Sequence, residues 1–162
     1  KIVASSESIR YKDEEWGRHN LLQSFGPLIY DMYQNNIIRN AGVLAGDYNT
    51  MLDLFLNISL ACSGSPVNVP GGGGPDQAGL NVLLGTAPFK DITRFTDSEE
   101  GWAAQLGTTG PQIAGKYGDR LVEKSPILVD NVVCTSNGKP FSIVHQYDRV
   151  PEWKQIIEKK YE

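Results

Sequence analysis

The chain has 162 residues, a size that suits one domain with a substantial core, and 40% of its residues are hydrophobic. Its formal net charge is −4, from 15 Lys and Arg against 19 Asp and Glu, which argues against general binding to nucleic acid or to anionic membranes, because such binding needs clustered cations. No apolar run has the length of a transmembrane helix, so we expect no transmembrane segment.

The first third of the chain predicts a strand, a broken helix and a second strand. Residues 1–5 are strand-like and are bounded by Ser-Glu-Ser. Helical spacing runs through residues 21–36, where Pro27 is placed to open a second helical piece. Residues 37–46 combine β-branched residues with glycine, which predicts a strand that leads into a tight turn.

Two helices are predicted next. Asp47 or Asn49 can cap the first, over residues 50–62. A glycine-rich loop then leads to the second, over residues 75–84, with Pro75 in its first turn. Helical spacing places one inward face on the first of these helices, formed by Met51, Leu52, Phe55, Ile58 and Cys62.

The second half of the chain predicts mainly β structure. Residues 90–95 form a candidate strand, and residues 97–125 are polar and glycine-rich with short helical pieces. Strands over residues 127–134 and 141–147 are joined by Asn137-Gly138, a strong signal for a hairpin turn.

An amphipathic helix ends the chain, with Pro151 near its start and Trp153, Ile156 and Ile157 facing inward. Strands and helices interleave along the sequence, which predicts the α/β class, a mixed sheet with flanking helices, within a single domain over residues 1–162. Cys62 and Cys134 lack C-x-x-C spacing and lie in apolar stretches, so we expect free thiols, with one disulfide as the alternative in an extracytoplasmic protein.

Four consecutive glycines precede the helix over residues 75–84. They match neither of the common phosphate-binding patterns, G-x-x-x-x-G-K-[ST] and G-x-G-x-x-G, so a loop without its own phosphate site is favoured. Asp76 follows in the first helical turn, where a carboxylate caps backbone N–H groups or reaches a ligand. Gln77 has no such capping role, and we expect it to face a cleft.

Two further polar residues are candidates for a site. Asn40 is a polar residue in an otherwise apolar strand, where it either closes a turn or lies at the edge of the sheet where α/β folds bind ligands. His145 ends a strand, and with only one other histidine in the chain a zinc site rich in histidine is excluded. A metal at His145 would therefore need oxygen ligands from carboxylates or phosphates.

Three stretches in order, IRNAGVLAG, PDQAGLNVLL and KPFSIVHQYDR, resemble the C-terminal half of nucleotide-sugar glycosyltransferases of the GT-A fold. The likeness is closest to the family 8 type, which is glycogenin-like and lipopolysaccharide galactosyltransferase-like, and it covers roughly residues 37–149. It implies transfer of a sugar from a nucleotide-diphosphate donor to an acceptor hydroxyl. The anomeric configuration would be retained if the likeness to family 8 holds.

The resemblance also implies roles for particular residues. Asn40 would contact donor or acceptor sugar, Asp76 would hydrogen-bond the transferred sugar, and Gln77 would lie beside the anomeric carbon. His145 would complete the coordination of a divalent cation, usually Mn²⁺, that bridges the diphosphate. Arg149 is the nearest candidate cation for phosphate, because HQYDR departs from the His-x-x-G-x-x-K-P-W ending of well-known members.

The chain also departs from the family in having no Asp-x-Asp motif, which supplies the other metal ligands. That motif and a nucleotide-binding half of about 100 residues would precede residue 1, so we expect a piece of a longer glycosyltransferase or an inactive relative. The alternative is a non-catalytic carbohydrate-binding or interaction domain, with Trp16, Trp102 or Trp153 stacking on sugars. The compartment stays open: cytoplasmic or membrane-associated in a bacterium, the Golgi lumen in a eukaryote.

Overall fold

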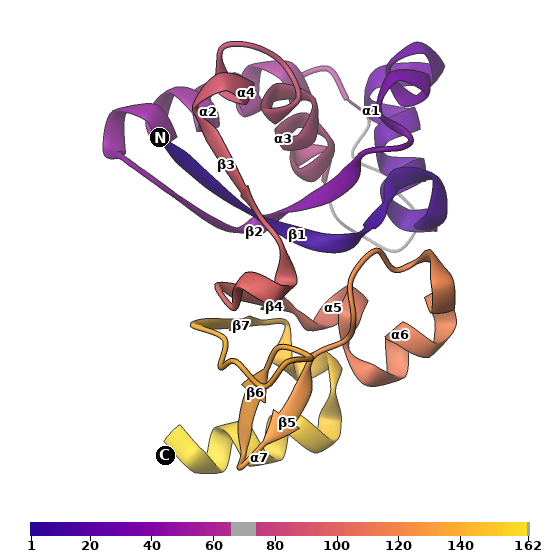
Figure 1. Ribbon diagram of the computed structural model, residues 1–162. Helices are drawn as coiled ribbons and strands as arrows, with labels where there is room; N and C mark the ends of the chain where they lie inside the picture. Colours follow the sequence, from indigo (N-terminus) through magenta and orange to yellow (C-terminus); the bar gives the residue numbers. More distant parts are fainter. Residues whose placement is uncertain (66–73, 162) are drawn as a thin grey trace.

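The computed structural model describes residues 1–65 and 74–161. Its largest sheet has three strands in the order β2-β1-β3 (Figure 1), comprising β1 (Ile2–Arg10), β2 (Ile37–Gly46) and β3 (Thr93–Thr96). Strand β2 is antiparallel to β1, whereas β3 is parallel to it. The prediction of a strand over residues 37–46 is therefore confirmed. Residues 71–73, three of the four consecutive glycines, lie outside the described residues.

Strand β1 is longer than the sequence predicts, because it continues through Ser-Glu-Ser to Arg10. Ser5, Ser6, Glu7 and Ser8 are all buried within it. Small hydroxyl side chains find acceptors inside the fold, as when Ser5 Oγ donates to the Val43 carbonyl at 3.3 Å. Buried polar residues can therefore continue a strand where the protein itself supplies their hydrogen-bond partners.

Helix α1 (Glu15–Tyr33) begins six residues before the predicted start at residue 21. Glu14 caps it by accepting hydrogen bonds from the backbone N–H groups of Trp16 and Gly17. The expected break is present, since Gly26 has a φ of 77° and Pro27 begins a second helical piece.

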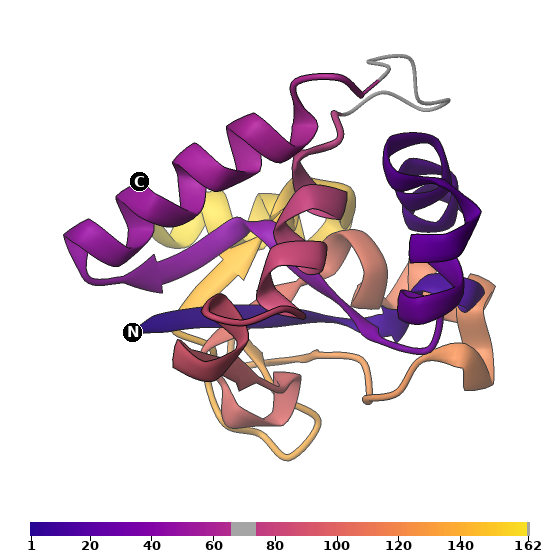
Figure 2. The same ribbon diagram turned by 90° about the horizontal axis from the view of Figure 1, so that it is seen from above.

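Helix α2 (Tyr48–Cys62) is capped by Asp47, one of the two candidates from the sequence, whose carboxylate accepts from Thr50 N–H at 3.1 Å. Its inward face is centred on the fully buried Leu54, whereas Leu52 and Phe55 are about half exposed. The predicted inward face is therefore rotated from the real one. Helix α3 (Asp76–Leu84) lies between α1 and α2 when the molecule is seen from above (Figure 2).

The segment predicted as a strand over residues 90–95 divides into a helical turn, α4 (Phe89–Ile92), and the start of β3. The polar stretch that follows contains η2 (Ser98–Glu100), β4 (Ala103–Gln105), α5 (Leu106–Thr109), α6 (Pro111–Tyr117) and η3 (Gly118–Arg120). Helices α5 and α6 lie on the opposite side of the three-stranded sheet from α2, α3 and α4 (Figure 1).

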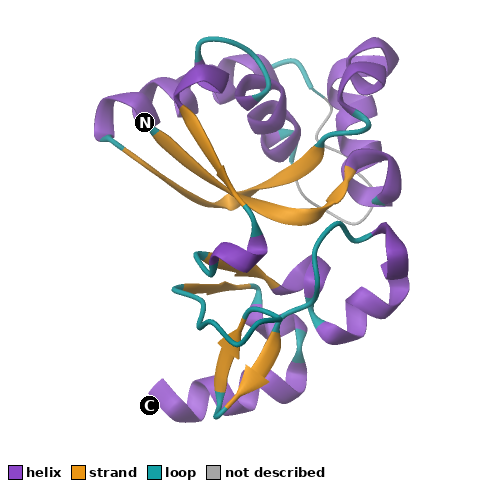
Figure 3. Cartoon of the chain, in the orientation of Figure 1, coloured by secondary structure: helices purple, strands orange, loops and turns teal. Residues whose placement is uncertain are grey.

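The predicted strand over residues 127–134 is a hairpin of two strands, β5 (Ile127–Val129) and β6 (Val132–Cys134) (Figure 3). Asp130 and Asn131 both have positive φ, 49° and 61°, which is the conformation of a tight two-residue turn. Gly138 also turns the chain, with a φ of 85°. The turn is present, since Thr135 N–H donates to the Lys139 carbonyl and Phe141 N–H to the Val133 carbonyl, with a bridge between Cys134 and Pro140. The predicted pairing of the two strands is wrong, however, because β7 (Ile143–His145) pairs in parallel with β4.

The chain ends in η4 (Tyr147–Arg149) and α7 (Pro151–Tyr161). Trp153 and Ile157 pack against a core of Ala104, Leu106, Val133, Phe141 and Val150, as expected for this helix. The protein is thus a mixed α/β structure of small sheets and flanking helices, as the sequence predicts. Within the described residues no helix is long and apolar enough to cross a membrane, and both cysteines are free.

Candidate functional site

A cleft of about 400 Å³ lies between the three-stranded sheet and the segments α5, α6 and η4. Asn40 of β2, Gln77 of α3 and Arg149 of η4 all line it. These three residues come from the three stretches that carry the resemblance, so the fold brings distant parts of the chain to one place. Further side chains with polar groups line it as well: Glu7, Glu14, Trp16, Thr108, Tyr117 and Gln146.

Glu7 is one of two buried carboxyl groups that line the cleft, with Glu14, and it is only 5% exposed. Its Oε1 accepts a hydrogen bond from Asn40 Nδ2 at 2.5 Å, and its Oε2 accepts from Thr108 Oγ1 at 2.8 Å. Burial raises the pKa of this carboxyl, and the two hydrogen bonds oppose the rise only in part. Glu7 therefore keeps its proton to higher pH than an exposed glutamate does.

Asn40 is held from both ends of its amide. Nδ2 donates to Glu7, and Oδ1 accepts from the backbone N–H of Gly42 at 2.7 Å. An asparagine amide carries two N–H donors, so one N–H remains for a ligand after Glu7 takes the other. The side chain is thus fixed in orientation, and its second N–H has no partner among the described residues.

Gln77 has a structural role that its position in the sequence does not indicate. Its Oε1 accepts a hydrogen bond from Ala41 N–H at 3.2 Å, on the edge of β2. Asn81, one helical turn further along α3, bonds Arg39 at both N–H (2.7 Å) and C=O (2.8 Å). Two side-chain amides of α3 therefore satisfy backbone groups of β2 as a neighbouring strand would. Within the described residues the Nε2 of Gln77 has no partner, which leaves it available to the cleft.

His145 lies beside the cleft and packs directly on Gly42. A Cβ placed on Gly42 would lie 2.7 Å from His145 Cε1, 2.9 Å from Nε2 and 3.0 Å from Asn40 Oδ1. Only glycine leaves room for the imidazole at this point of β2. Burial lowers the pKa of His145, and the nearby Asp148 opposes this more weakly. The neutral imidazole, which is the form that ligates metals, is favoured.

Arg149 is exposed at the cleft, shortly after a residue of unusual backbone conformation. Gln146 has a φ of 55°, and its side chain packs over Gly107, where an added Cβ would overlap Gln146 Oε1. Because Arg149 has no carboxylate partner among the described residues, its guanidinium is free to bind an anion.

Asp76 lies apart from the other candidate residues. It is exposed at the start of α3, does not line the cleft, and contributes to a raised pKa of the Cys62 thiol, for which burial is the larger cause. No side-chain hydrogen bond caps α3, whose N-cap is Pro75. The structure therefore groups Asn40, Gln77, His145 and Arg149 without Asp76.

Two aromatic side chains contribute to the lining of the cleft. Trp16 and Tyr117 both line it, and Tyr117 OH donates to Glu14 Oε1 at 3.2 Å. Burial, with the neighbouring Glu14, raises the pKa of Tyr117 to about 12. Aromatic faces next to amide and carboxyl groups suit ligands with both C–H and O–H surfaces, such as sugars.

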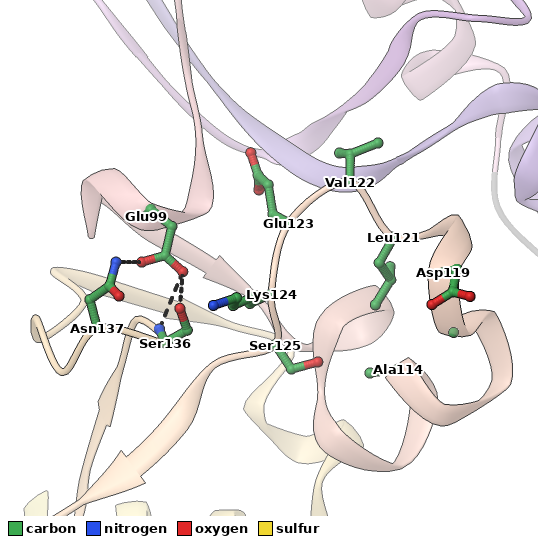
Figure 4. Close-up of a pocket in the computed structure, with 11 residues that line it drawn as sticks. Glu99, Ala114, Asp119, Leu121, Val122, Glu123, Lys124, Ser125, Ser136 and Asn137 are labelled. Carbon is green, nitrogen blue, oxygen red and sulfur yellow. Dashed lines mark hydrogen bonds between the residues drawn. The ribbon is translucent and has the colours of Figure 1, made fainter.

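A larger cavity, of about 660 Å³, is lined by Glu99, Asp119 and Glu123 among others, and two of these carboxylates have hydrogen-bond partners within the protein (Figure 4). Glu99 accepts from Ser136 Oγ at 2.6 Å and from Asn137 Nδ2 at 2.8 Å. Glu123 accepts from Ser98 N–H at 3.0 Å and from Ser8 Oγ. These carboxylates hold neighbouring loops together, which accounts for their position without a ligand.

Across residues 1–65 and 74–161 no three His, Cys, Asp or Glu residues are grouped so as to hold a metal ion. Comparison of the chain with protein-family models, curated proteins and solved structures gives no match.

Glu7 and Thr108 are the site residues that sequence reasoning missed. Glu7 lies in Ser-Glu-Ser, which locally resembles a strand boundary, and its partners are 33 and 101 residues away. A single acidic residue flanked by small hydroxyl side chains directly after an apolar run is the signal that could have found it.

Proposed function

We propose that the cleft is the sugar-binding side of a metal-dependent glycosyltransferase that moves a sugar from a nucleotide-diphosphate donor to an acceptor hydroxyl. The observation that carries the proposal is the convergence of Asn40, Gln77 and Arg149 on one cleft, with His145 packed beside Asn40. The resemblance assigns sugar or phosphate contacts to these residues from sequence alone, and the geometry is compatible with them.

The donors in the cleft are preorganised for hydroxyl and phosphate oxygens. Gln77 is anchored through its oxygen and Asn40 through both ends of its amide, so their remaining N–H groups point from fixed positions. Arg149 adds a cation for a diphosphate. Fixed donors of this kind stabilise charge that develops on a reacting sugar, because they need no reorganisation.

His145 fits a divalent cation as one ligand, not as a complete site. Its lowered pKa favours the neutral ring, and the described residues offer no further clustered ligands. The remaining ligands would come from diphosphate oxygens and from an Asp-x-Asp motif in a preceding segment of a longer chain. A Mn²⁺ ion held there would offset the negative charge of the departing nucleotide diphosphate.

The test is nucleotide release from a panel of nucleotide-diphosphate sugars with Mn²⁺, with the protein carrying any upstream segment that its gene encodes. We expect His145→Ala to lower the rate at least tenfold, whereas His19→Ala, which removes the other histidine, leaves it unchanged. If the longer protein binds neither Mn²⁺ nor a nucleoside diphosphate, the proposal is wrong.

A non-catalytic carbohydrate-binding domain is the second candidate, favoured by Trp16 and Tyr117 on the cleft wall. It predicts sugar binding by this chain without metal, measurable as quenching of Trp16 fluorescence on a glycan panel. Trp16→Phe should remove that signal, whereas Trp153→Phe, in the core of the C-terminal helix, should not. Metal-dependent release of nucleotide would instead favour the enzyme.

A further inference from the structure

A second pocket, of about 410 Å³, lies on the face of the three-stranded sheet that is opposite the cleft. Consecutive residues of a strand point to opposite faces. On β2, Ile38 and Asn40 line the cleft, whereas Ile37 and Arg39 line this second pocket. The strand therefore separates the two hollows, and they share no lining residue.

The side chains of this pocket carry positive charge only. Arg10 from the end of β1, Arg39 from β2 and Lys90 from α4 line it, and no Asp or Glu does. None of the three forms an ion pair within the described residues. Three cations in one hollow are an uneven distribution for a protein with a net charge of −4, and unpaired cations gathered in a concave site attract anions.

Arg39 is fixed in place before any ligand arrives. Its guanidinium lies 4.7 Å from the centre of the Phe95 ring and donates to the Thr96 carbonyl at 3.2 Å. A guanidinium has five N–H donors, so several remain. Burial lowers the pKa of Arg39, and the charges of Asp97 and Glu123 oppose this more weakly. An arginine that is partly desolvated and lacks an ion-pair partner gains most from a bound anion.

Neutral donors complete the pocket. Asn35 and Asn36, at the end of α1, line it beside Arg10. Phosphate has oxygens in several directions and takes donors from several sides, whereas a carboxylate presents two oxygens in one plane. Arginine and asparagine donors from separate segments therefore fit a phosphate better than a carboxylate.

We propose that the pocket formed by Arg10, Arg39, Lys90, Asn35 and Asn36 binds the phosphate group of a phosphorylated small molecule. This second site goes beyond the proposed glycosyltransferase cleft and does not depend on it. Arg10 and Arg39 bind phosphate oxygens through their forked N–H groups, and Lys90 adds a mobile charge at the exposed rim.

Titration of the protein with inorganic pyrophosphate, followed by amide NMR shifts, tests the proposal. We expect saturable shifts at Arg10, Asn36 and Gly85, and at least a tenfold loss of affinity in Arg10→Ala/Lys90→Ala. Lys154→Ala, on α7, is the control. It removes one positive charge, as each of the two substitutions does, and should alter affinity less than twofold. Lys90→Glu alone, at an exposed position, should weaken binding even if the double variant does not fold.

Three results would overturn the assignment. Absence of shifts at about 10 mM pyrophosphate would exclude a useful site. Equal binding of succinate would exclude a preference for phosphate. Loss of binding in Arg149→Ala, with binding kept in Arg10→Ala/Lys90→Ala, would place the anion in the cleft instead of this pocket.

Discussion

The two hollows on either side of β2 differ in how the polar side chains that line them find hydrogen-bond and ion-pair partners. On the cleft face, the Glu7 carboxyl accepts hydrogen bonds from two neutral side chains, Asn40 and Thr108. On the opposite face, Arg10 and Lys90 have no ion-pair partner among the described residues. The cleft face therefore combines a hydrogen-bonded network with one cation, Arg149, that has no ion pair among the described residues, whereas the other face gathers three cations and no carboxylate.

This contrast indicates what each face can recognise. The hydrogen-bonded network of the cleft offers a few fixed donors for hydroxyl oxygens, and Arg149 adds one cation at its exposed side. Unpaired cations lower their own free energy when an anion arrives, so they suit a charged ligand and give salt-dependent binding. One strand carries both because alternate residues face opposite sides.

Asn81 supports the edge of β2 that both faces share, and its loss should have the largest effect. Asn81→Ala leaves the N–H and C=O of Arg39 unpaired, which should cost about 2–4 kcal/mol of unfolding free energy. Urea denaturation measures this. Asn57→Ala, on the exposed side of α2, is the control, and an equal cost there would contradict the role given to Asn81.

Gly42→Ala tests whether the position of His145 matters, because it displaces the imidazole without changing the residue. A methyl group at Gly42 would meet the imidazole at 2.7 Å and displace it, at a cost of about 1–2 kcal/mol. Any Mn²⁺-dependent activity should fall with it. Gly115→Ala, where no atom lies within 4 Å of the added Cβ, should instead stabilise α6 by about 0.5–1 kcal/mol. Unchanged Mn²⁺-dependent activity in Gly42→Ala would show that His145 is not part of the site.

Glu7 makes the stability of the cleft face depend on pH. Because burial raises its pKa in the folded state above the ordinary value of a glutamate, the folded protein holds the proton more tightly, and stability should fall as pH rises through the folded pKa. Glu7→Gln should remove this part of the decline. Its size is about 1.4 kcal/mol for every tenfold difference in proton affinity between the folded and the unfolded carboxyl.

Urea midpoints from pH 4 upward provide the measurement. Burial also raises the pKa of Glu123. Its contribution to the fall in stability with rising pH should therefore persist in Glu7→Gln and disappear in Glu123→Gln. Parallel curves for wild type and Glu7→Gln would show that Glu7 titrates as an exposed residue does.

Arg149 should have the smallest effect on stability. It is exposed and forms no ion pair among the described residues, so Arg149→Ala should change the unfolding free energy by less than about 0.5 kcal/mol. Binding of a nucleoside diphosphate in the cleft should nevertheless weaken, and calorimetry at low salt would detect this. Unchanged binding would remove Arg149 from the phosphate side of the proposed site.

The sequence predicts those parts of the fold that short-range patterns decide. The α/β class, the strand over residues 37–46, the Asp47 cap and the break at Gly26-Pro27 each depend on neighbouring residues, and each is confirmed. Positive φ at Asp130 and Asn131 also has a local cause, and the D-N pair could have predicted the turn that was missed.

Long-range contacts account for the rest. The continuation of β1 past Ser5 depends on partners such as Thr108, and the bonds of Gln77 and Asn81 reach residues 36 and 42 positions away. The sequence selects Gln77 for its position after a loop, but shows neither the strand edge that it contacts nor the separation of Asp76 from the cleft. Hydrogen-bond partners of buried amides are set by tertiary packing, which no local window contains.

The paired amides of α3 also have a mechanical consequence. Gln77 and Asn81 are four residues apart, about 6 Å along the helix axis, and each holds a different residue of β2. Two attachment points fix both the sliding and the rotation of a rigid rod, whereas one leaves it free to pivot. Helix α3 is thus attached to β2 at two points, and this restrains the strand that separates the two hollows.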